Sequence, residues 1–253
     1  MNGERGSLGR LGVVGAQAAL ALALLGLWYL ATRARLVSPL LLPRPEDVAR
    51  KLPVLLGDGA TWAHVRLTVM ELLSAFGLSL LAGLGLGFWA GRSPYATRLL
   101  EPLLVALYTV PIVLLYPICI LVFGIGPASK VAFAAVYGFF PIAFNTMRGL
   151  ASVNPKYLTA AISLGATELQ LVRHVLLPGA LPVVVSGIRI GAAFALIGVV
   201  AGEMLGATGG LGYQIVWASQ TFNVPDLYAY MLMTLVLAGL VNAVVSRTEE
   251  RGF

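Results

Sequence analysis

The chain has 253 residues, of which 58% are hydrophobic and only 11% are charged, and its formal net charge is +6. A soluble globular domain has roughly 25% charged residues, so this composition excludes an ordinary soluble domain and points to lipid as the solvent. The basic residues flank hydrophobic runs and do not cluster with aromatic residues, which argues against a nucleic-acid partner. Because Cys119 is the single cysteine, no disulfide or cysteine-based metal site can form within one chain.

Long uncharged runs predict membrane helices, because crossing a bilayer core of about 30 Å takes roughly 20 apolar helical residues. The first run, 11–32, follows Arg5 and Arg10 as in a secretory signal, but it is too long for one, so we expect a retained helix. The other predicted spans are 72–91, 102–129, 131–147, 181–203 and 227–246. Six spans in an all-α membrane protein are therefore predicted.

Two segments outside these spans have a character of their own. Within 33–66, Pro45 followed by Glu46 and Asp47 favours a short helix along the membrane surface. The segment 204–225 is rich in glycine and polar side chains, and we expect an ordered external or re-entrant loop there. The whole chain, 1–253, is interpreted as one transmembrane domain, with an N-terminal helix and surface segment at 1–60 and a core at 61–247.

Small residues and prolines distinguish the second and third spans. Ala75, Ser79, Gly83, Gly87 and Gly91 recur four apart, a stripe that predicts close packing of another helix. The third span contains Pro111 and Pro117, which predict a kinked or locally unwound helix. Such a helix could act as a gate beside a transport path, or neighbouring helices could simply satisfy the freed carbonyls.

Three charged residues fall within or beside the hydrophobic spans. Glu71 and Glu203 lie near the ends of their predicted spans, where a carboxylate can reach interfacial water. A structural role is favoured for Glu71, whereas a structural and a functional role stay equally open for Glu203. Arg189 either contacts an anion in a pathway or snorkels to the membrane surface.

The distribution of basic residues gives weak evidence for the orientation of the chain in the membrane. Nine lie on the side that holds both termini, 92–98 and 148–174: Arg5, Arg10, Arg92, Arg98, Arg148, Lys156, Arg173, Arg247 and Arg251. Seven lie on the other side: Arg33, Arg35, Arg44, Arg50, Lys51, Arg66 and Lys130. These charges are interpreted as determinants of membrane topology.

Residues 155–178 interrupt the hydrophobic pattern with an amphipathic one. Apolar residues and a glycine recur at three- and four-residue steps: Leu158, Ile162, Gly165, Leu169, Val172 and Leu176. Asn154 and Pro155 form a helix start, Gly165 a helix end, and Thr167 with Gln170 a capping-box spacing. Two short helices meeting at Gly165 are predicted, and their almost bare surface favours docking to another protein over resting on the lipid headgroups.

This segment resembles the signature of permease subunits of bacterial ABC importers, the EAA motif of their last cytoplasmic loop. The matching positions are Ala160, Ala161, Gly165, Val175, Leu177 and Pro178, while Thr159 stands where the family has an acidic residue. The resemblance covers about 39–245, including LLPRPEDV and GEMLGATGGLGYQI, and is strongest to the nitrate, sulfonate, taurine and bicarbonate subgroup. The coupling residues it implies are Thr159, Ala160, Ala161, Leu164, Gly165, Ala166, Val175, Leu177 and Pro178.

The resemblance implies a MetI-like permease fold in the bacterial inner membrane and a transport role rather than an enzymatic one. Two copies would form the pore, 155–174 of each would dock as a coupling helix on a cytoplasmic ATPase, and an extracytoplasmic solute-binding protein would deliver the substrate. The chain would bind no cofactor or metal itself, since ATP is used by the partner and no GxxxxGK[ST] loop is present. It also implies that 148–178 lies inside and 206–225 outside.

The substrate that the subgroup suggests is a small oxyanion, such as a sulfonate, taurine, nitrate or bicarbonate. Similar permeases carry aromatic acids, riboflavin or thiamine precursors. A rival from another class is a proton-coupled secondary transporter using Glu71 or Glu203, which predicts an inverted repeat that the sequence does not show. A membrane enzyme is disfavoured because His64 and His174 are far apart and have no clustered acids. Pathway candidates are Pro111, Pro117, Arg189 and Glu203.

Overall fold

The computed structural model describes residues 3–251, with side chains for 15–247, and every element in that range is helical. Five helices are long and apolar enough to cross a membrane, and a bent pair makes a sixth span if it is counted as one. The helices are α1 (Gly3–Arg33), α2 (Pro45–Gly57), α3 (Gly59–Gly91), α4 (Pro94–Thr109), α5 (Tyr116–Phe123), α6 (Pro127–Ala151), α7 (Pro155–Ser163), α8 (Glu168–Leu171), α9 (Leu177–Gly206), α10 (Leu211–Gln220) and α11 (Val224–Arg251). The predicted all-α membrane architecture is confirmed.

The chain divides into two units, and the first comprises residues up to Gly59 together with 215–232. Within it, Trp28 Nε1 donates to the carbonyl of Pro43 (2.9 Å), and the Tyr228 hydroxyl donates to the carbonyl of Leu41 (3.0 Å). Lys51 Nζ lies 2.9 Å from a carboxylate oxygen of Asp226. The predicted short helix beginning at Pro45 is confirmed as α2, with both acids in its first turn.

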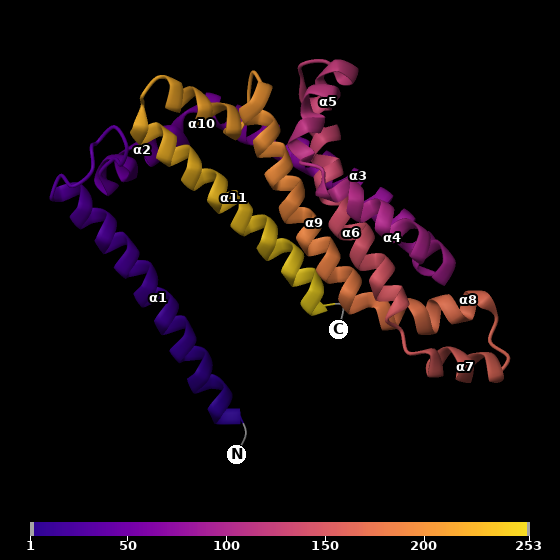
Figure 1. Ribbon diagram of the computed structural model, residues 1–253. Coiled ribbons are helices and arrows are strands. Elements are labelled where there is room, and N and C mark those ends of the chain that lie inside the picture. The colour runs from indigo at the N-terminus through magenta and orange to yellow at the C-terminus, as the bar shows by residue number, and fades with distance from the viewer. Residues whose placement is uncertain (1–2, 252–253) are drawn as a thin grey trace. The chain divides into compact units, whose positions relative to one another are not determined.

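The second unit, 60–214 with the chain from Met233 onward, is built around α3, α6 and α9. The small residues of α3 face α6, because a Cβ added to Gly87 would lie 2.5 Å from the Cβ of Thr146. Helix α6 also runs alongside α9 (Figure 1), where a Cβ on Gly191 would lie 2.5 Å from Ile142 Cγ1. The stripe predicted for the second span is thus confirmed as a packing surface within the chain.

The third predicted span is broken in two. The stretches Pro94–Thr109 and Ile112–Phe123 are bent by 83° at Pro111, whose backbone is not helical (φ −56°, ψ 103°). Pro117 lies in the first turn of α5, where a missing backbone N–H leaves no helical hydrogen bond unmade. Local unwinding is therefore confirmed at Pro111, and the helix continues through Pro117.

Two predicted boundaries are wrong. The second span was expected to begin at 72, but α3 begins at Gly59, so that Arg66 and Glu71 lie within the helix. The segment 204–225 was expected to be an ordered external or re-entrant loop, but its first residues, up to Gly206, belong to α9, and Leu211–Gln220 forms the short helix α10. In the first stretch, polar side chains have partners elsewhere in the chain, as Thr68 has in Glu203, so a polar run does not end the helix there.

Candidate functional site

Residues 152–178 form the pair of short helices that the capping signals predict. Asn154 Oδ1 accepts from Lys156 N (2.9 Å) at the start of α7, and Gly165 follows α7 with a φ of +80°. The Thr167 backbone N–H donates to Gln170 Oε1 (2.8 Å), which closes the capping box of α8. A π turn, Val172–Leu176, then leads directly into α9.

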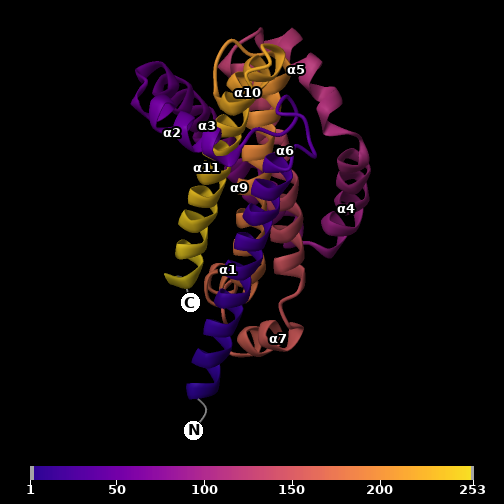
Figure 2. The ribbon, with the colours of Figure 1, turned by 90° about the vertical axis from the view of Figure 1, so that its left-hand side faces the viewer.

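This segment lies at one end of the α6 and α9 pair, and α5 lies at the other end (Figures 1 and 2). Val175 and Leu176 pack against the buried cluster of Leu150, Val153 and Ala180, so the segment is attached firmly to α6 and α9. Leu177 and Pro178 open α9. The second half of the motif therefore joins the segment to the membrane helices.

The residues around the first half of the motif are exposed. Leu164 is 88% exposed and Leu169 75%, and Tyr157 and Ile162 are exposed as well. Nothing lies within 4 Å of where a Gly165 side chain would begin, so the fold itself does not need a small residue there beyond its positive φ. Thr159 donates to the carbonyl of Pro155 (3.0 Å) and turns back onto its own helix. Large apolar side chains are therefore exposed on both sides of Gly165 in this segment.

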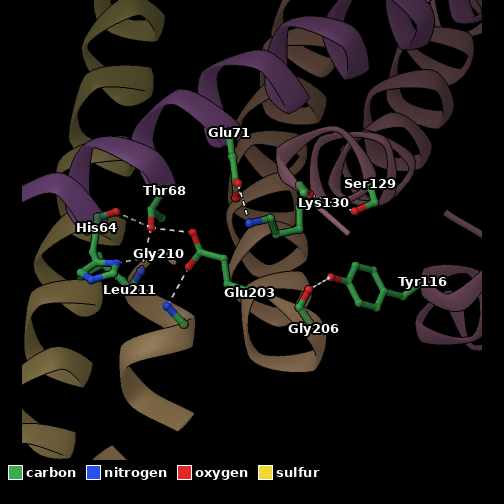
Figure 3. Close-up of polar contacts among 12 residues, drawn as sticks. His64, Thr68, Glu71, Tyr116, Ser129, Lys130, Glu203, Gly206, Gly210 and Leu211 are labelled. Atoms are coloured by element: carbon green, nitrogen blue, oxygen red, sulfur yellow. Dashed lines mark hydrogen bonds and ion pairs between the residues drawn. The ribbon is translucent and has the colours of Figure 1, made fainter. Parts of the chain in front are cut away.

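A second set of functional candidates lies buried among α3, α6 and α9 (Figure 3). Glu71 Oε1 lies 2.7 Å from Lys130 Nζ, and the two side chains are 1% and 2% exposed. The expectation that Glu71 reaches interfacial water is wrong, and Lys130, counted among the outer basic residues, is a buried ion-pair partner and not an exposed charge. The two charges are buried in the second unit because each has the other as its partner.

Glu203 is also buried, at 1% exposure, so the expectation that it reaches interfacial water is wrong too. Its carboxylate accepts from the Thr68 hydroxyl (2.6 Å) and from the backbone N–H of Gly212 (2.7 Å). Thr68 Oγ1 accepts from Leu211 N (2.9 Å), and His64 Nδ1 accepts from Gly210 N (3.1 Å). Three successive backbone N–H groups are thus held by side chains of α3 and α9.

The remaining pathway candidates do not gather around Glu203. Arg189 is exposed on α9, and its Nε donates to Asn242 Oδ1 on α11 (3.1 Å). Pro111 lies at the break after α4. Tyr116, five residues later, donates its hydroxyl to the carbonyl of Gly206 (3.1 Å) at the end of α9. Among the side chains that the structure describes, no three His, Cys, Asp or Glu residues are placed to hold a metal ion.

Sequence reasoning did not single out Thr68, or assign Lys130 and His64 to this cluster. Their partners are far along the chain: Thr68 and Glu203 are separated by 135 positions, and His64 and Gly210 by 146. A lysine close to the start of an apolar run, as Lys130 is, could have signalled a buried partner. The pattern around Thr68 carries no such signal.

Residues 83–248, well over half of the chain, match the model of the family described as "Binding-protein-dependent transport system inner membrane component". The chain belongs to this family. It is therefore an inner-membrane, multi-pass permease subunit of an ABC importer. As such it works within a binding-protein-dependent transport system, and it is not itself an enzyme.

Individual relatives agree with this assignment. The chain is 32% identical over 235 residues to the taurine transport system permease protein TauC of Escherichia coli (strain K12), covering 90% of this chain and 82% of that protein. It is 34% identical over 232 residues to the formylaminopyrimidine transport permease protein ThiX of Halalkalibacterium halodurans, covering 90% and 91%. An inward-facing structure of the MetNI methionine ABC transporter shares the fold, with a TM-score of 0.65, 22% identity, and coverage of 74% of this chain and 93% of that one. The expected MetI-like fold is confirmed.

Proposed function

We propose that two copies of this permease form the transport pathway and that segment 155–174 of each docks in a cleft on a cytoplasmic ATPase subunit. The observation that carries the proposal is the exposure of Leu164 and Leu169 on either side of Gly165. Apart from Gly165 and its two chain neighbours, no atom of the described residues lies within 4 Å of a Cβ built on Gly165, so a partner protein has room to approach the backbone closely there. The coupling residues are those of the motif: Thr159, Ala160, Ala161, Leu164, Gly165, Ala166, Val175, Leu177 and Pro178.

The mechanism follows from how the segment is attached. Closure of the ATPase subunits around ATP displaces the docked α7 and α8, and the displacement passes through the packed Val175 and Leu176 into α6 and α9. In this mechanism ATP is bound and hydrolysed by the partner, and this chain holds no cofactor. An extracytoplasmic solute-binding protein delivers the substrate to the opposite side.

The substrate class that we propose is a small sulfonate such as taurine, supported by the similarity to TauC across 90% of the chain. The similar identity to ThiX makes a formylaminopyrimidine, a thiamine precursor, the second candidate. Riboflavin and aromatic acids are further alternative substrates.

The test is uptake by the reconstituted complex of permease, ATPase and solute-binding protein in proteoliposomes, with labelled taurine and labelled formylaminopyrimidine as separate probes. Taurine uptake that needs both ATP and the binding protein supports the whole proposal. Uptake of the pyrimidine alone replaces the substrate class and keeps the mechanism. Uptake by the permease without any ATPase overturns the coupling mechanism.

A further inference from the structure

Helix α10 has no capping side chain of its own. It begins at Leu211, and the residue before it is Gly210, so the first backbone N–H groups find no acceptor nearby in the sequence. Acceptors come instead from two other helices: Thr68 on α3 binds Leu211 N, and Glu203 on α9 binds Gly212 N (Figure 3). A carboxylate is favourably placed there, since the N-terminal end of a helix carries partial positive charge.

The segment 207–212 consists of the loop before α10 and the first two residues of that helix, and it is called the loop 207–212 below. It is held mainly through its backbone. A Cβ added to Gly210, which has a φ of +107°, would lie 2.1 Å from Glu203 Oε1, and one added to Gly212 would lie 2.8 Å from Glu203 Cβ. Leu211 is the one large side chain that this loop buries. Hydrogen bonds of this kind are directional, so they are made in one arrangement of the loop and lost in another.

The loop lies on the extracytoplasmic side of a permease whose coupling segment is cytoplasmic. Helix α9 starts directly after that segment, at Leu177, and ends at Gly206. Its 30 residues rise about 1.5 Å each, which is enough to cross the bilayer core once. The loop therefore follows α9 on the outer side.

We propose that His64, Thr68 and Glu203 are positioning residues for transport, forming a latch that holds the loop 207–212 closed on the outer side at rest and releases it when the pathway opens outward. The latch rests on the proposed coupling to an ATPase, since it is nucleotide-driven opening that releases it. Neither the motif of segment 155–178 nor the similarity to other permeases assigns these three residues a role. The buried Glu71 and Lys130 pair lies beside the latch (Figure 3).

The test uses the assembled complex with its solute-binding protein and a cysteine reporter. Cys119→Ser removes the native thiol, and Leu211→Cys places a thiol at a buried position whose backbone N–H is held by Thr68. A membrane-impermeant maleimide should label this reporter slowly at rest and faster in the vanadate-trapped complex. Adding Thr68→Val should raise the resting labelling rate by roughly tenfold, the change expected when one buried hydrogen bond is lost.

The same variant should also raise ATPase activity in the absence of the binding protein, and Thr68→Ser should restore both values because it keeps the hydroxyl. Two controls are matched to the site. Thr208→Cys, an exposed reporter in the same loop, should label equally in every background. Ser79→Ala removes another buried hydroxyl of α3, one that donates to the Ala135 carbonyl, and should leave the Leu211→Cys reporter slow.

A second variant, His64→Phe, tests the latch if Thr68→Val does not assemble. His64→Phe removes the acceptor for Gly210 N and keeps a ring beside Tyr213, where the ring centroids lie 6.1 Å apart. Resting labelling and basal ATPase activity at parental values in an assembled variant would overturn the latch, and so would failure of both variants to assemble. Failure of the parental chain to bind its ATPase would instead overturn the proposed coupling.

Discussion

Lys130 on α6 and Glu71 on α3 form an ion pair with 2.7 Å between Nζ and Oε1, and both side chains are almost completely buried. Breaking such a pair on one side leaves an uncompensated charge inside the protein, which is far more destabilising than removing both charges. The pair therefore ties α3 to α6 and adds an ionic contact to the packing of the small-residue stripe.

We expect Lys130→Met to lower the free energy of unfolding by about 3–5 kcal/mol, because the Glu71 carboxylate loses its partner. The double variant with Glu71→Gln should recover most of that loss, since no buried charge remains. Thermal unfolding of the purified chain in detergent measures both effects. A double variant as unstable as Lys130→Met would show that the ion pair is not the source of the stability.

Gly87→Ala should destabilise the chain by about 1–3 kcal/mol, as overpacking does in a close-packed core. The reason is that the new Cβ would lie 2.5 Å from the Thr146 Cβ across the contact with α6. Gly85→Ala is the matched control on the same helix, with nothing within 4 Å of its Cβ. It should be neutral or slightly stabilising, because alanine is the better helix former. Equal unfolding temperatures for the two variants would contradict the packing described for α3.

Gly165→Phe should abolish co-purification of the ATPase and, with it, ATP-driven uptake. The new side chain meets nothing in the permease itself, so its own stability should fall only by about 1–2 kcal/mol, the strain of a positive φ. Gly165→Asn is the control, since asparagine tolerates this backbone conformation and adds less bulk. Normal ATPase binding and normal uptake by Gly165→Phe would count heavily against docking at this segment.

Leu164→Ser should weaken ATPase binding by roughly tenfold or more, as truncation of an interface hot spot does, without lowering the unfolding temperature of the permease alone. The comparison is Leu121→Ser on α5, an equally exposed leucine (85% against 88%) at the other end of α6 and α9. That variant should bind the ATPase normally. Titration of the ATPase into permease in nanodiscs measures both affinities, and equal losses for the two variants would argue against a specific contact at Leu164.

Local signals predicted much of this structure. The break at Pro111 follows from a proline that cannot continue a helix, and the two helices meeting at Gly165 follow from caps only a few residues apart. The stripe from Ala75 to Gly91 predicted close packing because small residues four apart share one face of a helix. In each case the residues that decide the structure are neighbours in the chain.

The buried polar contacts could not be predicted in the same way. The sequence alone predicts that Glu71 and Lys130 lie at membrane edges, because it does not show that each has its partner on another helix. Helix α10 was missed because its cap comes from Thr68 and Glu203, and its glycine-rich start resembles a loop when it is considered alone. Long-range pairing decides these features, and a single sequence does not display it.

The exposed leucines of segment 155–178 have a consequence for how the transporter is made. If segment 155–174 docks on an ATPase as proposed, a permease synthesised without that subunit would expose Leu164 and Leu169 to the aqueous cytoplasm, where exposed apolar patches promote aggregation and proteolysis. Surplus permease would thereby be removed, and the supply of ATPase would set how many copies persist in the membrane. The surface proposed to couple transport to ATP would then also keep the subunits in proportion.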